Sequence, residues 1–166
     1  MSVPPGTATP TATPGGSTRT PTPYRPSLRQ VLVINEVCSN PVITDNVPDG
    51  VISGDSAVEL FNSSSLLLDL SLYRLCVNVT CLWLEGTIQA SGYKAWYQQW
   101  NGLGFVEGGA NTVQLYGAGE SPLVLVDTLA IQSQTPDHCW AAVTDASPVY
   151  VESIRRRWGV ENNSLP

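Results

Sequence analysis

The chain has 166 residues, a length that suits one compact domain with or without a tail. Hydrophobic residues make up 42%, which is enough for a core, whereas charged residues are only 13% and sum to a net charge of −6. Phosphate binding needs a positive surface, so this balance argues against nucleic acid as a partner. No apolar run approaches the roughly 18 residues of a membrane span, and we expect no membrane insertion in this segment.

The first 29 residues differ in composition from the rest of the chain. Residues 1–26 contain seven prolines and seven threonines, and large aliphatic side chains are almost absent. Such a segment cannot offset the entropy cost of ordering its backbone, so residues 1–29 are predicted to be a disordered linker. The composition also fits an O-glycosylated stalk. The start has no signal peptide, and we expect the natural protein to continue upstream with a secretion signal or an anchor.

From Val31 onward the sequence has the pattern of short β-strands. Residues 31–38 are an apolar, β-branched run, and residues 57–62 alternate, with Val58 and Leu60 on one face and Glu59 on the other. Turns rich in Gly, Pro and Ser separate the segments, which favours a sandwich or barrel over a parallel sheet. Further strands are predicted at 66–70, 73–76, 81–84, 93–99, 112–116, 123–130, 139–143 and 149–154, with a short helical turn within 98–103.

Short segments of the chain resemble the lamin-tail domain family in order and spacing across residues 31–143. In place of the Gly and Trp of the family's D-L-S-G-W segment, this chain has Leu72 and Tyr73. The matching segments are VINEV at 33–37 (the family's I-N-E), VELFN at 58–62 (V-E-L-Y-N), LDLS at 68–71, ASGY at 90–93 (A-G-G-Y), and 110–116 with 126–128 (the G-D-T-V-x-L hairpin and the V-D-S strand).

The resemblance implies an immunoglobulin-like β-sandwich without a catalytic site. Bacterial members are typically exported modules, often attached to hydrolases or surface proteins, and animal members are the partner-binding tails of nuclear lamins. The Pro/Thr-rich start suits the exported type. We therefore predict an all-β, immunoglobulin-like sandwich of about eight or nine strands at residues 30–158, followed by an irregular tail at 159–166.

Four cysteines, Cys38, Cys76, Cys81 and Cys139, allow three pairings. The spacing of Cys76 and Cys81 suits a disulfide that closes a hairpin, because facing strand positions bring Cβ atoms near bridging distance. Cys38 and Cys139 would then join an early strand to a late one. Two such bonds would imply an oxidising compartment. Buried free thiols, or a zinc site assisted by His138, are the alternatives.

Three aspartates, Asp45, Asp49 and Asp55, fall in a Gly- and Pro-rich loop. Carboxylates on loops bind Ca²⁺ in extracellular sandwiches, so these residues are candidate Ca²⁺ ligands. The alternative, which we favour, is a solvated loop in which Asp serves as a turn residue. No other metal or cofactor is predicted.

Trp96, Tyr97 and Trp100 form a candidate binding cluster. Strand alternation puts Trp96 and Tyr97 on opposite faces, so one is expected in the core and the other on the surface. Exposed rings could stack on sugars or on a protein partner, but packing of most of these rings in the core is the alternative that we favour.

The segment Asp137-His138-Cys139 is the nearest approach to catalytic chemistry. In a strand, His138 and Cys139 would point to opposite faces, and the chain has no second histidine. Glu36 and Glu59 have apolar neighbours; they are either a carboxylate pair for metal or acid–base work or, as we favour, groups that face solvent or accept hydrogen bonds at a sheet end. We therefore predict no catalytic residue and no enzymatic activity.

The leading functional hypothesis is a non-catalytic extracellular or cell-surface module. It would bind or position a protein or glycan partner, as a monomer or a weak oligomer. The alternatives are a Ca²⁺- or carbohydrate-binding accessory domain of a larger exported enzyme and an intracellular lamin-like scaffold. Asn62, Asn78 and Asn162 each begin a sequence that fits an N-glycosylation site.

Overall fold

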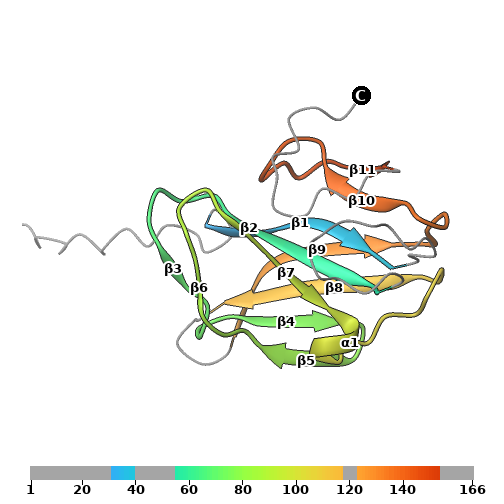
Figure 1. Cartoon of the computed structure of the whole chain (residues 1–166), viewed down its shortest axis with the longest axis horizontal. Coiled ribbons are helices and arrows are strands. Elements are labelled where there is room, and N and C mark those ends of the chain that lie inside the picture. Colours follow the sequence, from blue (N-terminus) through green and yellow to red (C-terminus); the bar gives the residue numbers. More distant parts are fainter. Residues whose placement is uncertain (1–30, 40–54, 118–122, 154–166) are drawn as a thin grey trace, which may run out of the picture.

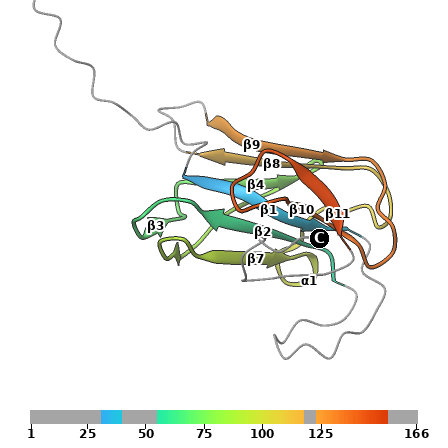
Figure 2. The ribbon, with the colours of Figure 1, turned by 90° about the horizontal axis from the view of Figure 1, so that it is seen from above.

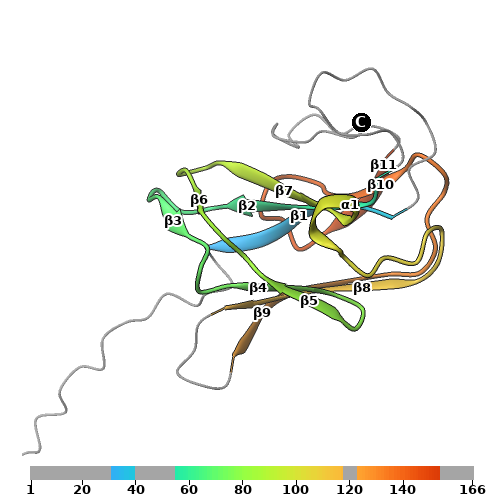
Figure 3. The ribbon, with the colours of Figure 1, turned by 60° about the horizontal axis from the view of Figure 1, so that its bottom comes forward.

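The computed structural model describes residues 31–39, 55–117 and 123–153. Antiparallel strands form two large sheets that lie face to face (Figure 1, Figure 3). The five-stranded sheet has the order β11-β10-β1-β2-β7, and the four-stranded sheet has the order β5-β4-β8-β9. The predicted all-β sandwich is therefore confirmed. The predicted linker (1–29) and tail (159–166) lie outside the described residues.

The strand bounds follow the predicted segments within a few residues. The five-stranded sheet contains β1 (Leu32–Cys38), β2 (Ala57–Asn62), β7 (Tyr93–Tyr97), β10 (Cys139–Ala142) and β11 (Tyr150–Ser153). The four-stranded sheet contains β4 (Arg74–Val77), β5 (Thr80–Trp83), β8 (Asn111–Gly117) and β9 (Val124–Ile131). A ribbon of β3 (Leu68–Asp69) and β6 (Thr87–Ile88) lies at one end of the sandwich, and the helix α1 (Gln98–Asn101) lies toward the other (Figure 1, Figure 3). No helix among the described residues is long and apolar enough to cross a membrane.

The core lies between the two sheets and is filled by alternate residues of each strand. In β8, Val113 and Leu115 are buried in the core, whereas Thr112 before them is exposed and Gln114 between them is only partly buried. Burial of such aliphatic side chains contributes roughly 25 cal/mol per Å² of apolar surface, which makes this core the main stabilising element. The fully buried members that the sheets contribute are Leu32, Ile34, Val37, Val58, Leu60, Leu75, Val77, Val113 and Leu115.

β1 lies between β10 and β2 in the five-stranded sheet (Figure 2). Every one of its residues is buried. It pairs with β2 along its length, but with β10 only at Glu36 and Val37. The N–H group of Ile34 donates instead to Asp127 Oδ2 of β9, at 3.0 Å, and its carbonyl accepts from the Tyr150 hydroxyl of β11, at 2.6 Å. These two side chains satisfy backbone groups that would otherwise be buried without partners.

The predicted strand at 66–70 is shorter than expected. Only Leu68 and Asp69 are extended, and the preceding Leu66 and Leu67 are 72% and 57% exposed. The buried side chain of Asn62 is the physical reason, because its Nδ2 donates to the carbonyls of Leu66, Ile88 and Gln89. The chain after β2 is thereby held in a turn. The short strand β6 is too brief for periodicity to predict.

We expect Asn62→Ala to lower the free energy of unfolding by about 1–3 kcal/mol, because the buried carbonyl of Ile88 and the part-buried carbonyls of Leu66 and Gln89 would lose their donor. Asn62→Asp should be equally damaging, since a carboxylate cannot donate to them. Urea denaturation measures both effects, with the exposed neighbour variant Ser65→Ala as the control that leaves stability unchanged. Wild-type stability in Asn62→Asp would contradict the assignment.

Both predicted cysteine pairs are disulfide-bonded. Cys76 and Cys81 face each other across the β4–β5 hairpin, with Cα atoms 4.0 Å apart. Cys38 at the end of β1 is bonded to Cys139 at the start of β10, with Cα atoms 4.4 Å apart and a sequence separation of 101. No cysteine is free. The alternatives of buried thiols and of a zinc site are therefore set aside for this form of the chain.

The two bonds should contribute unequally to stability. Loop-closure entropy gives about 4–5 kcal/mol for the loop closed by Cys38–Cys139 and about 2 kcal/mol for the hairpin bond. We therefore expect the double variant C38A/C139A to lose about twice as much unfolding free energy as C76A/C81A. Urea denaturation of this matched pair tests the ranking, and equal losses would contradict the chain-entropy explanation.

Candidate functional site

A groove of about 570 Å³ opens between β5 and β7, which are outer strands of the two sheets. α1 follows directly on β7 (Figure 3). Its residues Trp100 and Asn101 line the same groove. The walls carry aromatic, charged and amide groups together. The residues that matter for its chemistry are Trp83, Glu85, Lys94, Trp96, Trp100 and Asn101.

Two tryptophans present their rings to solvent in this groove. Trp83 of β5 and Trp100 of α1 are each 56% exposed. Trp96 and Tyr97 lie on opposite faces of β7 as predicted, but both are buried, at 5% and 9% exposure. For these two rings, packing in the core, the alternative favoured from the sequence, therefore holds, and neither is the exposed member of the cluster. Tyr97 contacts the Trp100 ring, with centroids 5.1 Å apart in a T-shaped arrangement.

Trp83 was absent from the predicted cluster. Its signal in the sequence is the alternation of residues 82–84, because Leu84 is buried and Leu82 packs against the core, which turns the ring between them outward. Its proximity to Trp100 depends on which outer strands meet at this side of the sandwich, and that is a property of the topology.

α1 is fixed at both ends by side chains and by a glycine. The Gln99 N–H donates to the carboxylate of Asp55, at 3.0 and 3.1 Å, and Asn101 Oδ1 accepts from the Tyr97 N–H, at 3.0 Å. Gly102 ends the helix at a φ of 64°, in the left-handed region that glycine tolerates best. Trp100 is thus carried by a short but well-anchored element.

Lys94 is held across the groove. Its Nζ donates to the Glu85 carbonyl at 2.8 Å and lies 5.4 Å from the ring centre of Trp96, within cation–π range. A Lys side chain has three N–H donors, so two remain for a ligand. With the exposed carboxylate of Glu85, the groove holds one positive and one negative group.

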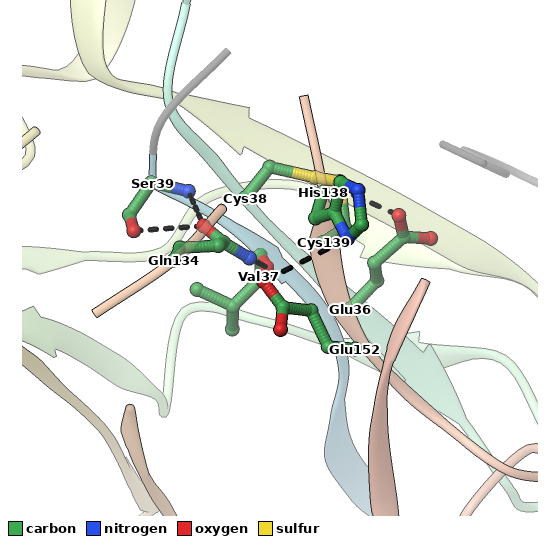
Figure 4. The surroundings of a disulfide bond; sticks show 8 residues. All are labelled: Glu36, Val37, Cys38, Ser39, Gln134, His138, Cys139 and Glu152. Carbon is green, nitrogen blue, oxygen red and sulfur yellow. Dashed lines mark hydrogen bonds and ion pairs between the residues drawn. A yellow bond between two sulfur atoms is a disulfide. The ribbon is translucent and has the colours of Figure 1, made fainter. Parts of the chain in front are cut away.

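A second polar cluster surrounds the Cys38–Cys139 bond (Figure 4). Gln134 is buried there; its Oε1 accepts from the N–H and hydroxyl of Ser39, and its Nε2 donates to the Val37 carbonyl. These bonds tie the segment before β10 to the end of β1. The cluster is a structural junction between distant parts of the chain.

His138 lies beside this junction, where its Nδ1 is 3.7 Å from Glu152 Oε1 (Figure 4). Its neighbour Cys139 is in the disulfide and offers no thiolate nucleophile. Glu36, Cys38 and Cys139 are the one trio of metal-ligating types that the described residues bring together, with ligand atoms within 4.8 Å. Because both sulfurs are bonded to each other, this trio is not a metal site in the oxidised chain.

Glu36 and Glu59 are directly opposite each other on β1 and β2, and both are fully buried. The expectation that they face solvent is therefore wrong, whereas hydrogen bonding is confirmed for Glu59, which accepts from Asn35 Nδ2 at 2.9 Å. Glu36 Oε1 lies 3.6 Å from Cys38 Sγ. A buried carboxylate needs such donors. The hydrogen bond between Asn35 and Glu59 therefore has a structural role inside the five-stranded sheet.

Of the three candidate Ca²⁺ ligands, Asp45 and Asp49 lie outside the described residues. Asp55 is half-buried, and both of its oxygens accept from the Gln99 N–H. It therefore acts as a cap for α1.

Comparisons with protein-family models, with curated proteins and with solved structures found no match for this chain.

Burial raises the pKa of Asp55 from its ordinary value of 3.8, against the opposing hydrogen bonds from Gln99 and Ser56. A raised folded-state pKa favours folding when the carboxyl is protonated, and this contribution is lost as the pH rises through that pKa. Asp55→Asn keeps one acceptor without the charge. We therefore expect it to gain stability relative to the parent chain as the pH rises above 3.8.

Asp55→Ala should instead lose about 0.5–2 kcal/mol at neutral pH, because α1 loses its cap. Urea denaturation at acidic and neutral pH measures both variants. A stability difference between Asp55→Asn and the parent that does not change with pH would contradict the prediction.

Proposed function

We propose that this chain is a non-catalytic binding module, exported or displayed at a cell surface, that holds another macromolecule in the groove between β5 and β7. One observation carries the proposal: Trp83 and Trp100 are half-exposed in one groove on anchored elements. Large exposed rings cost free energy in water and recover it when a partner covers them. Interfaces are enriched in such tryptophans.

We further propose that the module is of the lamin-tail type. Hydrogen bonds connect the segments that carry the resemblance. Asn35 of the first segment donates to Glu59 of the second, and Asp127 of the last accepts from Ile34 of the first. Asn62 of the second segment holds the turn that follows it.

The two disulfides support the extracellular localisation. Such bonds form and persist in oxidising compartments and are rare in the cytosol and nucleus. They favour the hypothesis of an exported module over that of an intracellular scaffold. A Pro/Thr-rich start would then act as a spacer between the module and its attachment point.

Retention by the immobilised chain tests the proposal. The chain should retain protein or glycan from the medium and envelope of the cells that produce it. The double variant W83A/W100A should lose that retention, because its two large contact surfaces are gone. The matched control Leu66→Ala removes an exposed apolar side chain outside the groove lining and should retain as the parent does.

Retention that is equal in the parent and in W83A/W100A would show that another surface binds. Retention by neither chain would overturn the binding-module proposal. Both substituted rings are exposed, so the double variant should keep the thermal midpoint of the parent, which a melting curve checks.

A further inference from the structure

The groove combines stacking surfaces with hydrogen-bonding groups of both kinds. The Trp83 and Trp100 rings are accessible, the Glu85 carboxylate accepts, and the ammonium of Lys94 donates. The amide of Asn101 adds a further donor, because its oxygen is already used by the Tyr97 N–H. A matching ligand must therefore present apolar faces and, around them, groups that both donate and accept.

Sugar rings have this dual character. One face of a pyranose exposes C–H groups, which pack on an aromatic ring, and its rim carries hydroxyls, each of which donates and accepts. We infer that the groove binds a short segment of a neutral glycan, with Trp83 and Trp100 as the stacking surfaces and with Glu85, Lys94 and Asn101 as hydroxyl partners. This inference rests on the proposed function and names its ligand class.

Charge separates neutral from acidic glycans. The chain has a net charge of −6, so a sulfated or uronic acid polymer would be repelled on approach. Within the groove, Lys94 is balanced by Glu85, and Lys94 already donates to the Glu85 carbonyl. Among the described residues, Lys94 is the one cation that lines this groove, so a ligand without charge fits best.

The geometry also disfavours a peptide added as a strand to β7. Strand addition needs free backbone groups along the outer strand. At Tyr97 the N–H is taken by Asn101 Oδ1, because α1 folds back over the end of β7. The last residue of β7 is therefore closed to an added strand, and the groove offers a ligand the side chains of Glu85, Lys94 and Asn101.

The groove has the size and rigidity that a short oligosaccharide requires. Its volume of about 570 Å³ falls within the range of roughly 300–1,000 Å³ that is usual for small-ligand sites. Trp100 is positioned before binding by its contact with Tyr97 and by the Asp55 cap on α1. Less ordering is then needed on binding, which favours affinity.

NMR titration of the full chain tests this inference. The probes are neutral oligomers of glucose, mannose, xylose and N-acetylglucosamine, with heparin and alginate oligomers as anionic comparators. At least one neutral oligomer should shift the indole N–H signals of Trp83 and Trp100. Trp83→Ala and Trp100→Ala should each weaken that binding by about tenfold, and Trp100→Tyr should restore most of it, because a ring still stacks.

Leu66→Ala is the matched control and should bind as the parent chain does. The inference is overturned if no neutral oligomer shifts a groove signal, if the anionic oligomers bind more tightly, or if binding survives both tryptophan substitutions. If glycans fail while the immobilised chain still retains a protein in a Trp83-dependent way, the binding module stands and its partner is a protein. If both experiments fail, both proposals fall.

Discussion

The fold depends on hydrogen-bond partners for the buried backbone groups of β1. This strand is buried on both faces and is hydrogen-bonded to β10 over only part of its length. The buried N–H and carbonyl of Ile34 need partners, and Asp127 from the opposite sheet and Tyr150 from β11 supply them. A strand of this kind is stable only when elements distant in sequence are already in place around it. The core and the two sheets are therefore mutually dependent.

The pairing register of the five-stranded sheet positions one wall of the groove relative to β1. β1 aligns β2, β2 aligns β7, and β7 places Trp96 in the core and Tyr97 on the other face. α1 then continues from β7, and Asp55, which precedes β2, caps it. The exposed ring of Trp100 is thus the end of a chain of contacts that begins at the centre of the sheet. Trp83 is positioned separately, by the β4–β5 hairpin that the Cys76–Cys81 bond closes.

The local sequence pattern predicts the longer strands and the hairpin disulfide, because both depend on neighbouring residues. Alternation and turn residues located the longer strands, and spacing identified Cys76 and Cys81 as a hairpin pair, which left Cys38 for Cys139. Alternation also put Glu59 on the face opposite to Val58. It could not reveal that this face is covered as well, because coverage depends on segments far away in the chain. The exposure of Leu66 and the meeting of Trp83 with Trp100 likewise depend on tertiary contacts, and a two-residue strand such as β6 has no periodicity to detect.

The Cys38–Cys139 bond has a mechanical consequence. Its sequence separation of 101 encloses every strand from β2 to β9, and with them the whole groove. If the chain is pulled from its two ends, the load passes from β1 to β10 through a covalent bond. The enclosed strands are then outside the path of the force. The groove between β5 and β7 would therefore keep its shape while the ends of the chain are under tension.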